Sequence, residues 1–421
     1  MEELLKKIYH KLSGLAIVRA MGKMYLDGFP IGNQIAFNRI KKVQKNCNRK
    51  SPIKVVFLAQ VSELWNKQSD IYNAMKENPL FEPVIFLIPQ FDIVNNKLET
   101  EYTNSYFIEN YKDLIKSYNK GKWYDLKSLK PDYVFYQRPY DSYLPKEYRS
   151  SEVSKYSKCC YVPYGYAGAD VFNEGNTNKL FFRNIYMTFL ESGYMASLLK
   201  KKFKKSVRNK VQFFENIGYP SLSRYFSIES VDEFSRVLWT PRWSYDPVLG
   251  GSNYLKYKDT LFKIKEEFGD SRVTFRPHPL LWGELRNKSL MTEKEIKKYL
   301  EQLSAKDIIY DTDSPLFTTL NKTDILITDY SSIMIEFFLT GRPIIYCDGG
   351  IELNKEYSNL VKGMYVAHNE EEIMKYVKDL KNGNDYLKDK RNAMIKKYKE
   401  KHLHAKDNIV KFIQDDFMIT F

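Results

Sequence analysis

The stretch DILITDYSSIMIEF, residues 324–337, indicates how this chain folds. After Asp324, the run ILIT at 325–328 is mostly apolar and β-branched, as in a strand buried on both faces, and residues 333–337 favour a helix. Only the four residues 329–332 separate the two. A strand that passes through a short turn into a helix is the repeating unit of α/β folds with a parallel sheet.

Similar strand-like runs recur along the chain and alternate with helical segments. The runs lie at 53–59, 81–89, 131–139, 159–165, 235–241, 272–279, 308–312 and 342–347. Helices are predicted at 180–217, 333–340 and 385–414, among others. Because the strands form two series with a break near 225–235, we predict an α/β protein with two facing Rossmann-like lobes.

We expect four parts in the chain. Residues 1–52 form a basic amphipathic helical extension, with a helix over 4–25, and 53–230 form the N-terminal lobe. Residues 231–385 form the C-terminal lobe, and 386–421 form a C-terminal helix that can pack back on the N-terminal lobe. Ligands of such sheets bind beyond the carboxyl ends of the strands, so the loops there are the candidate sites.

The charge balance favours an anionic partner. The 421 residues carry 66 Lys and Arg against 52 Asp and Glu, a formal net charge of +14. Such an excess suits a phosphorylated substrate, an anionic polymer, nucleic acid or a membrane surface. The four cysteines lack metal-type or disulfide-type spacing, and no apolar run approaches the ~18 residues of a membrane span. With an acidic start in place of a secretory signal, this predicts a cytoplasmic protein with reduced thiols and no metal site.

The turn at 329–332 is the first candidate binding feature. Ser331 and Ser332 precede a helix, where backbone N–H groups, hydroxyls and the helix dipole favour an anion; simple helix capping is the alternative. Glu336 lies one turn further along the same face. Its carboxylate could accept both hydroxyls of a ribose, or it is a partly exposed helix charge.

Two loops after other predicted strands carry positive charge. In TFRPHPL, residues 274–280, Arg276 ends the strand and His278 is fixed between two prolines. A guanidinium beside an imidazole suits the neutralisation of phosphate. In TPRWSYDPVLGGSN, residues 240–253, Arg242 adds charge and two adjacent glycines permit close approach to a ligand, although an ordinary turn explains them equally well.

Together, RPHP, TDYSSIMIEF, the GYP turn at 218–220 and the VLWTP strand resemble the CDP-glycerol glycerophosphotransferase family over about 216–348. This resemblance implies the glycosyltransferase-B fold, a C-terminal lobe that binds a CDP-linked donor, and an N-terminal lobe for the acceptor. It places Arg276, His278, Asp329, Ser331 and Ser332 around the diphosphate, adds Arg242 to the donor-binding residues, and sets Glu336 near the ribose.

The N-terminal lobe departs from the family at one motif. Members carry His-Gly-Thr-Pro with the histidine as the expected base, whereas this chain reads VPYGY at 162–166. Tyr164 therefore stands in for the histidine. We expect its phenol to orient an acceptor hydroxyl, because its usual pKa is near 10. Asp170 and Glu63 are the candidate substitute bases, and His278 completes the candidate catalytic set.

The expected activity is transfer of a polyol phosphate, glycerol phosphate first, from a CDP-linked donor to an acceptor hydroxyl with release of CMP. The acceptor is a polyol-phosphate chain or a lipid-linked glycan in teichoic-acid or capsule synthesis, and no cofactor is permanently bound. Two alternatives stay open: a glycosyltransferase of the same fold that uses a nucleotide sugar, and a non-catalytic binder of anionic polymer. Nucleic acid is not an expected partner, because no nucleic-acid module is recognisable.

Basic residues also gather away from the candidate donor site. Residues 200–210 contain seven Lys and Arg and no acidic residue, and the segment 39–54 contains a further basic run. These runs are either a solvated face or a surface for anionic lipid or polymer. The second reading predicts a peripheral protein on the inner face of the cell membrane.

Overall fold

The computed structural model describes residues 30–45, 52–92, 97–102, 105–169, 177, 179–229, 231, 233–247, 250–312 and 314–419. The predicted helix over 4–25, Cys47 and Asp170 lie outside these residues. The chain divides into two compact units. Unit 1 comprises Met1–Tyr164, Glu174–Ser221 and His404–Phe421, and unit 2 comprises Gly165–Asn173 and Leu222–Leu403.

Unit 1 is built on a parallel sheet. Its strand order is β11-β10-β9-β8-β1-β2-β5, and every pairing is parallel. The central β1 is buried along almost its whole length, as its apolar run IKVVFLA requires. The strands are β1 Ile53–Ala59, β2 Phe81–Leu87, β5 Ile115–Lys116, β8 Tyr133–Tyr136, β9 Lys158–Tyr161, β10 Met187–Phe189 and β11 Phe213–Glu215.

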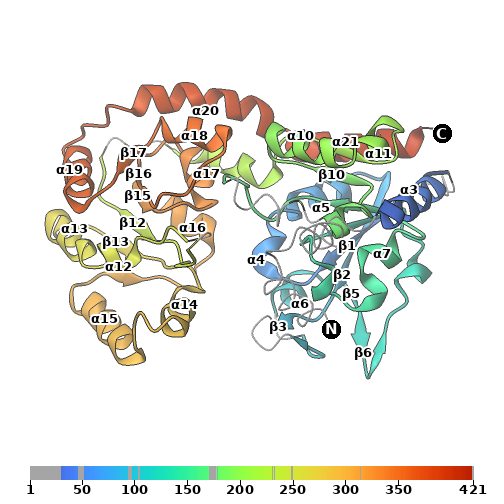
Figure 1. Ribbon diagram of the computed structural model, residues 1–421, viewed down its shortest axis with the longest axis horizontal. Helices are drawn as coiled ribbons and strands as arrows, with labels where there is room; N and C mark the ends of the chain where they lie inside the picture. The colour runs from blue at the N-terminus through green and yellow to red at the C-terminus, as the bar shows by residue number, and fades with distance from the viewer. Residues whose placement is uncertain are drawn as a thin grey trace, which may run out of the picture. The chain divides into compact units, whose positions relative to one another are not determined.

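Helices and two short antiparallel pairs complete unit 1 (Figure 1). The helices are α3 Pro30–Lys45, α4 Ser62–Trp65, α5 Ser69–Lys76, α6 Tyr106–Asn110, α7 Ser150–Val153, α9 Lys179–Phe182, α10 Gly193–Lys202, α11 Lys204–Arg208 and α21 Ala405–Met418. The pairs join β3 Phe91–Asp92 to β4 Lys97–Leu98 and β6 Tyr118–Asn119 to β7 Lys122–Trp123.

Helix α21 is fastened to the sheet of unit 1 by a buried polar cluster. Asp416 accepts hydrogen bonds of 2.6 Å from Lys158 Nζ of β9, from the Tyr133 hydroxyl of β8 and from the Tyr186 hydroxyl. The Lys158 and Asp416 side chains are only 2% and 5% exposed. The same helix also packs beside α5 (Figure 1). The last helix of the chain is thus an integral part of unit 1.

Unit 2 is built on a second parallel sheet, of order β14-β13-β12-β15-β16-β17. Its strands are β12 Val237–Thr240, β13 Val273–Phe275, β14 Ile309–Tyr310, β15 Ile325–Thr328, β16 Ile344–Cys347 and β17 Tyr365–Ala367. Its helices are α12 Tyr254–Tyr257, α13 Thr260–Phe268, α14 Leu281–Asn287, α15 Glu293–Ala305, α16 Leu316–Asn321, α17 Ile333–Phe338, α18 Lys355–Val361, α19 Glu370–Lys381 and α20 Lys388–His402.

A short segment from the first half of the sequence completes unit 2. Of Gly165–Asn173, residues 165–169 are described. Gly168 N–H donates to the Tyr330 hydroxyl at 3.1 Å, and Asn354 N–H donates to Gly168 O at 2.9 Å. A Cβ on Gly168 would lie 2.5 Å from the Tyr357 ring, so only glycine fits. The predicted N-terminal lobe, 53–230, included this segment, whereas in the structure it clusters with the other unit.

The two-lobed α/β fold predicted from the sequence is confirmed, with differences in detail. The segment 180–217, predicted as helical, also contains the strands β10 and β11. The single helix predicted over 385–414 is two helices, α20 and α21, and the chain passes from unit 2 to unit 1 between them. None of the helices in the described part of the chain is long and apolar enough to cross a membrane.

Candidate functional site

The candidate site of unit 2 lies where the strand order of its sheet reverses. From β12 the chain moves outward through β13 to β14 on one side, then continues through β15, β16 and β17 on the other. At such a switch point the loops after neighbouring strands diverge and leave a crevice for a ligand. The loops that begin at residues 241, 276 and 329 follow β12, β13 and β15.

Asp329 organises the loop after β12. Its Oδ2 accepts the backbone N–H of Arg242 at 2.8 Å and that of Asn253 at 3.1 Å, and its Oδ1 accepts Asn253 Nδ2 at 3.0 Å. The residue is fully buried. Burial raises its pKa to about 6, although the hydrogen bonds from Asn253 and Arg242 act in the opposite direction. Through these hydrogen bonds, the Asp329 carboxylate holds the backbone of the loop after β12 in place.

Arg242 is held over the turn that follows β15. Its Nε donates to Gly250 O at 2.6 Å, one terminal nitrogen donates to Tyr330 O at 3.3 Å, and the guanidinium lies 5.3 Å from the centre of the Tyr330 ring. Burial lowers its pKa below the usual value, but the group stays charged at neutral pH. A fixed positive charge therefore stands beside residues 329–332.

His278 stands next to this loop. Its ring lies 5.8 Å from the Trp243 ring, and its Nδ1 accepts the Leu280 N–H at 3.2 Å. Although the residue as a whole is exposed, desolvation of the ring by its neighbours and then the charge of Arg242 lower its pKa to about 4. The imidazole is therefore neutral at physiological pH. Since Nδ1 accepts a hydrogen bond, Nε2 carries the proton and can donate.

The two serines of the turn after β15 differ in their surroundings. Ser332 is exposed and its hydroxyl makes no cap hydrogen bond to α17. The Ser331 Oγ is buried and makes no hydrogen bond within the described residues. A buried hydroxyl without a partner costs free energy unless a ligand supplies one. The sequence left open that Ser332 caps the helix with its side chain, and its hydroxyl does not do so.

Arg276 and Glu336 make specific contacts within unit 2. An Arg276 terminal nitrogen donates to Asp311 Oδ2 at 2.8 Å and to Thr319 Oγ1 at 3.3 Å. Glu336 is 4% exposed rather than a surface charge, and its Oε2 accepts the Tyr225 hydroxyl at 3.0 Å. Both side chains are oriented by these partners.

Tyr164 belongs to unit 1, unlike the residues above. Its hydroxyl lies 3.1 Å from that of Tyr140, and the two rings are 6.2 Å apart. Burial, followed by the neighbouring Tyr140, raises its pKa well above the usual range. The phenol therefore stays protonated. Of the two candidate bases, Glu63 is exposed in α4, where Ser62 Oγ donates to its Oε2 at 3.0 Å, and Asp170 is not among the described residues.

Sequence reasoning missed the residues that hold the loops after β12 and β13. Asn253 bonds both Asp329 and the Cys347 carbonyl, at 3.0 and 3.1 Å, and Asp311 holds Arg276. Asn253 gave one usable signal, since it lies two residues after the glycine pair. In the part of the chain that the structure describes, no group of three or more His, Cys, Asp or Glu side chains is arranged to hold a metal ion.

The C-terminal part of the chain matches a known protein family. Residues 222–414 match the family CDP-Glycerol:Poly(glycerophosphate) glycerophosphotransferase. The resemblance predicted from the sequence is confirmed over this range. The range contains all seven predicted donor-binding residues, Arg242, Arg276, His278, Asp329, Ser331, Ser332 and Glu336. Tyr164 and Asp170 precede it. No protein with a curated description matches the chain.

Solved structures share the fold at low sequence identity. The wall teichoic acid polymerase TagF is 15% identical, with a TM-score of 0.55 and 91% of this chain and 94% of that chain covered. A protein from Listeria monocytogenes described as a UDP-N-acetylglucosamine 2-epimerase is 14% identical, with a TM-score of 0.56 over 87% and 97%. The UDP-GlcNAc 2-epimerase from Methanocaldococcus jannaschii is 15% identical, with a TM-score of 0.53 over 86% and 99%. These likenesses concern the fold.

Proposed function

We propose that this chain is a glycerophosphotransferase that uses CDP-glycerol. The hydroxyl of an acceptor attacks the phosphorus that carries glycerol, the bond from that phosphorus to the bridging oxygen breaks, and CMP leaves with the bridging oxygen. The hydroxyl proton passes to a base or to solvent. The observation that carries the proposal is the family match, because it spans the whole set of donor-binding residues at the edge of the unit 2 sheet.

The donor diphosphate is proposed to lie at the turn after β15. There Ser332 offers a hydroxyl, Ser331 Oγ lacks a partner among the described residues, and Arg242 supplies a fixed positive charge. His278 donates from Nε2 to an oxygen that gains negative charge as CMP leaves. Phosphoryl transfer has a loose transition state, so positioned donors and charge contribute more than covalent chemistry.

Two of the predicted donor residues act differently in this proposal, and a third keeps its predicted place. Asp329 and Arg276 hold the loops after β12 and β13, since their charged groups are bonded to protein partners. Glu336 stays near the ribose, with Tyr225 orienting its carboxylate. These assignments distinguish residues that contact the donor from residues that position those contacts.

On the acceptor side, Tyr164 is proposed to orient the acceptor hydroxyl without removing its proton. Its raised pKa and its contact with Tyr140 support this role. Asp170 and Glu63 remain the proposed bases. The acceptor is proposed to be a polyol-phosphate chain or a lipid-linked glycan of teichoic-acid or capsule synthesis.

We further propose that unit 1 docks on an anionic membrane through a basic surface. This surface comprises the exposed Lys41, Lys42 and Lys45 of α3 and Lys201, Lys202, Lys204, Lys205 and Arg208 of α10 and α11. Lys205 Nζ donates to Gln34 Oε1 of α3 at 2.6 Å, so the helices form one surface. Ile31 and Ile35 on α3 are 74% and 53% exposed and suit the lipid interface. Each Lys near such a surface contributes on the order of 1 kcal/mol.

The transfer reaction is tested by measuring CMP release against a panel of donors. We expect release from CDP-glycerol, or from another CDP-polyol, in the presence of a polyol-phosphate acceptor. The folded His278→Ala variant is the matched control and should release about 100-fold less. Turnover of a nucleotide sugar without turnover of any CDP-polyol would overturn the proposal.

Membrane docking is tested by sedimentation with vesicles of anionic and of neutral lipid. Binding should require the anionic lipid and weaken at high salt. Replacing Lys201, Lys202, Lys204 and Lys205 by Gln should reduce it by orders of magnitude and leave the affinity for CDP-glycerol unchanged. Unchanged sedimentation of this variant would assign these lysines to solvated surface.

A further inference from the structure

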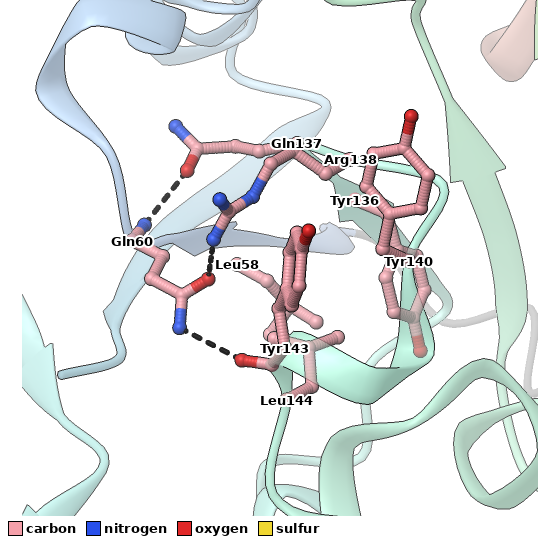
Figure 2. A pocket seen from close by; sticks show the side chains of 8 residues that line it. All are labelled: Leu58, Gln60, Tyr136, Gln137, Arg138, Tyr140, Tyr143 and Leu144. Carbon is pink, nitrogen blue, oxygen red and sulfur yellow. Dashed lines mark hydrogen bonds between the residues drawn. The ribbon is translucent and has the colours of Figure 1, made fainter. Parts of the chain in front are cut away.

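Unit 1 contains a second candidate site, at the carboxyl ends of β1 and β8. Figure 2 shows the side chains that line a hollow there. The hollow has about 250 Å³ of empty space, including the solvent at its mouth. Its lining combines glutamines, tyrosines and one arginine. The lining residues are Leu58, Gln60, Tyr136, Gln137, Arg138, Tyr140, Tyr143 and Leu144.

Arg138 is the unusual member of this group. Its guanidinium donates to the neutral Gln60 Oε1 and lies 4.7 Å from the centre of the Tyr143 ring. No carboxylate among the described residues pairs with it, and burial lowers its pKa. Charged groups that are partly buried are normally paired with an opposite charge. A guanidinium with several unused N–H donors at the edge of a hollow therefore points to an anionic ligand.

The frame around Arg138 is fixed by two buried glutamines. Gln137 Oε1 accepts the backbone N–H groups of Gln60 and Val61 at 2.8 and 2.9 Å. Gln60 Nε2 in turn donates to Pro89 O at 2.8 Å. It also donates to Tyr143 O at 3.0 Å (Figure 2). These bonds join the ends of β1, β2 and β8, so the Gln60 oxygen that receives Arg138 cannot turn away. The arginine is preorganised before any ligand arrives.

Tyrosines provide the remaining polar contacts. The Tyr140 and Tyr143 rings lie 5.3 Å apart, and the Tyr140 hydroxyl contacts that of Tyr164. Tyr143 is stacked on Phe91 at 4.7 Å, which fixes the ring beneath Arg138. A phenol hydroxyl can donate a hydrogen bond to an anion. They connect the arginine to the residue proposed to orient the acceptor hydroxyl.

We propose that Arg138, with Tyr140 and Tyr164, binds a phosphate group of the acceptor. The ligand class is a polyol phosphate, such as the terminal unit of a poly(glycerol phosphate) chain, with its phosphate on Arg138 and its hydroxyl towards Tyr164. This rests on the proposed function, which supplies an acceptor of this kind. It explains why a positive charge that has no counter-charge among the described residues lies beside the residue that replaces the histidine of the family.

The test measures the binding of glycerol 3-phosphate to the whole chain by NMR or calorimetry. CMP is present in the sample to occupy the donor site. We expect Arg138→Gln to weaken binding by about ten- to a hundred-fold, the effect of losing charge-assisted hydrogen bonds. Arg272→Gln removes the same charge from an exposed position before β13 and should change nothing. Glycerol, which lacks the phosphate, should not compete.

Equal binding to wild type and Arg138→Gln, or competition by glycerol, would overturn the proposal. Arg138→Lys is the second variant; it keeps the charge but loses the planar donor pair, and should bind more weakly than wild type. Folding provides a further readout. Because Arg138 has no counter-charge among the described residues, Arg138→Gln should melt at the wild-type temperature or above it, and a lowered melting temperature would make the arginine a structural residue.

Kinetics separate this inference from the proposed function. Arg138→Gln should raise KM for the polyol-phosphate acceptor and leave KM for CDP-glycerol unchanged. An unchanged acceptor KM contradicts the acceptor site while leaving the transferase intact. If wild type releases no CMP from any CDP-polyol, the transferase proposal fails, and the binding measurements still decide whether Arg138 recognises phosphate.

Discussion

Substitution of Asp416 by alanine should destabilise unit 1 strongly. The carboxylate accepts hydrogen bonds from Lys158, Tyr133 and Tyr186, each at 2.6 Å, at a site that is almost closed to solvent. Its loss would leave a buried ammonium without a counter-charge, which costs about 3–5 kcal/mol. Two hydroxyls would also lose their acceptor. A domain of this size is stable by only about 5–15 kcal/mol, so the change removes a large share of the total.

Asp415 offers a matched control on the next position of the same helix. It pairs with Lys411 on the surface at 2.8 Å, and both side chains are more than half exposed, so Asp415→Ala should cost under about 0.5 kcal/mol. Hydrogen exchange of the β8 and β10 amides, read by mass spectrometry, reports unit 1 alone. The double variant Asp416→Ala/Lys158→Met should recover stability, because the unpaired charge is gone. Equal exchange in the Asp416→Ala and Asp415→Ala variants would refute the reasoning.

Three further predictions concern the sites. His278→Gln, which keeps a side-chain N–H, should retain more CMP release than the His278→Ala variant, and equal loss in the two would contradict the donor role. Tyr164→Phe should cost far less turnover than His278→Ala, since no proton transfer is removed; a comparable loss would place the phenol in the chemistry. Burial raises the pKa of Asp329 from 3.8 to about 6, so the folded state binds the proton more tightly than the unfolded state. The stability that this provides is fully present below pH 4. It is lost as the pH rises through 6, a decrease of about 3 kcal/mol in the unfolding free energy. The stability difference between wild type and Asp329→Asn, measured by urea unfolding from pH 4 to 7, should show this fall, and a difference constant with pH would disprove it.

Much of the fold could be predicted from the sequence, because many strands are apolar runs of typical strand length. The run 53–59 coincides with β1, because a central strand buried on both faces has a nearly continuous apolar sequence, here interrupted only by Lys54. Strand β10 was missed, since its three residues lie within a segment that also contains two helices. The break between α20 and α21 was missed because Leu403 and His404 are compatible with a helix. What separates those helices is the transfer of the chain from one unit to the other, which has no local signal.

The candidate donor site was only partly predictable. Charged residues at strand ends singled out the loops after β12, β13 and β15, but sequence spacing does not reveal which charges already have protein partners. Arg276 is paired with Asp311, 35 positions away, and Asp329 with the loop after β12. The Arg-Pro pair that made Arg276 a candidate residue also occurs at Arg138, which was not among the predicted site residues. Only their hydrogen bonds distinguish the two arginines. Arg276 donates to the carboxylate of Asp311, whereas Arg138 donates to the amide oxygen of Gln60.

The place of α21 in unit 1 has a consequence for synthesis of the chain. Unit 2 from Leu222 to Leu403 is inserted between β11 and α21, so the ribosome completes unit 2 before it supplies the last helix of unit 1. Until then Lys158 has no Asp416, and the face beside α5 is uncovered. Although the sheet of unit 1 is translated first, its folding should finish second. A chaperone that protects this chain during translation would thus be needed at the N-terminal half, for as long as the C-terminal half takes to emerge.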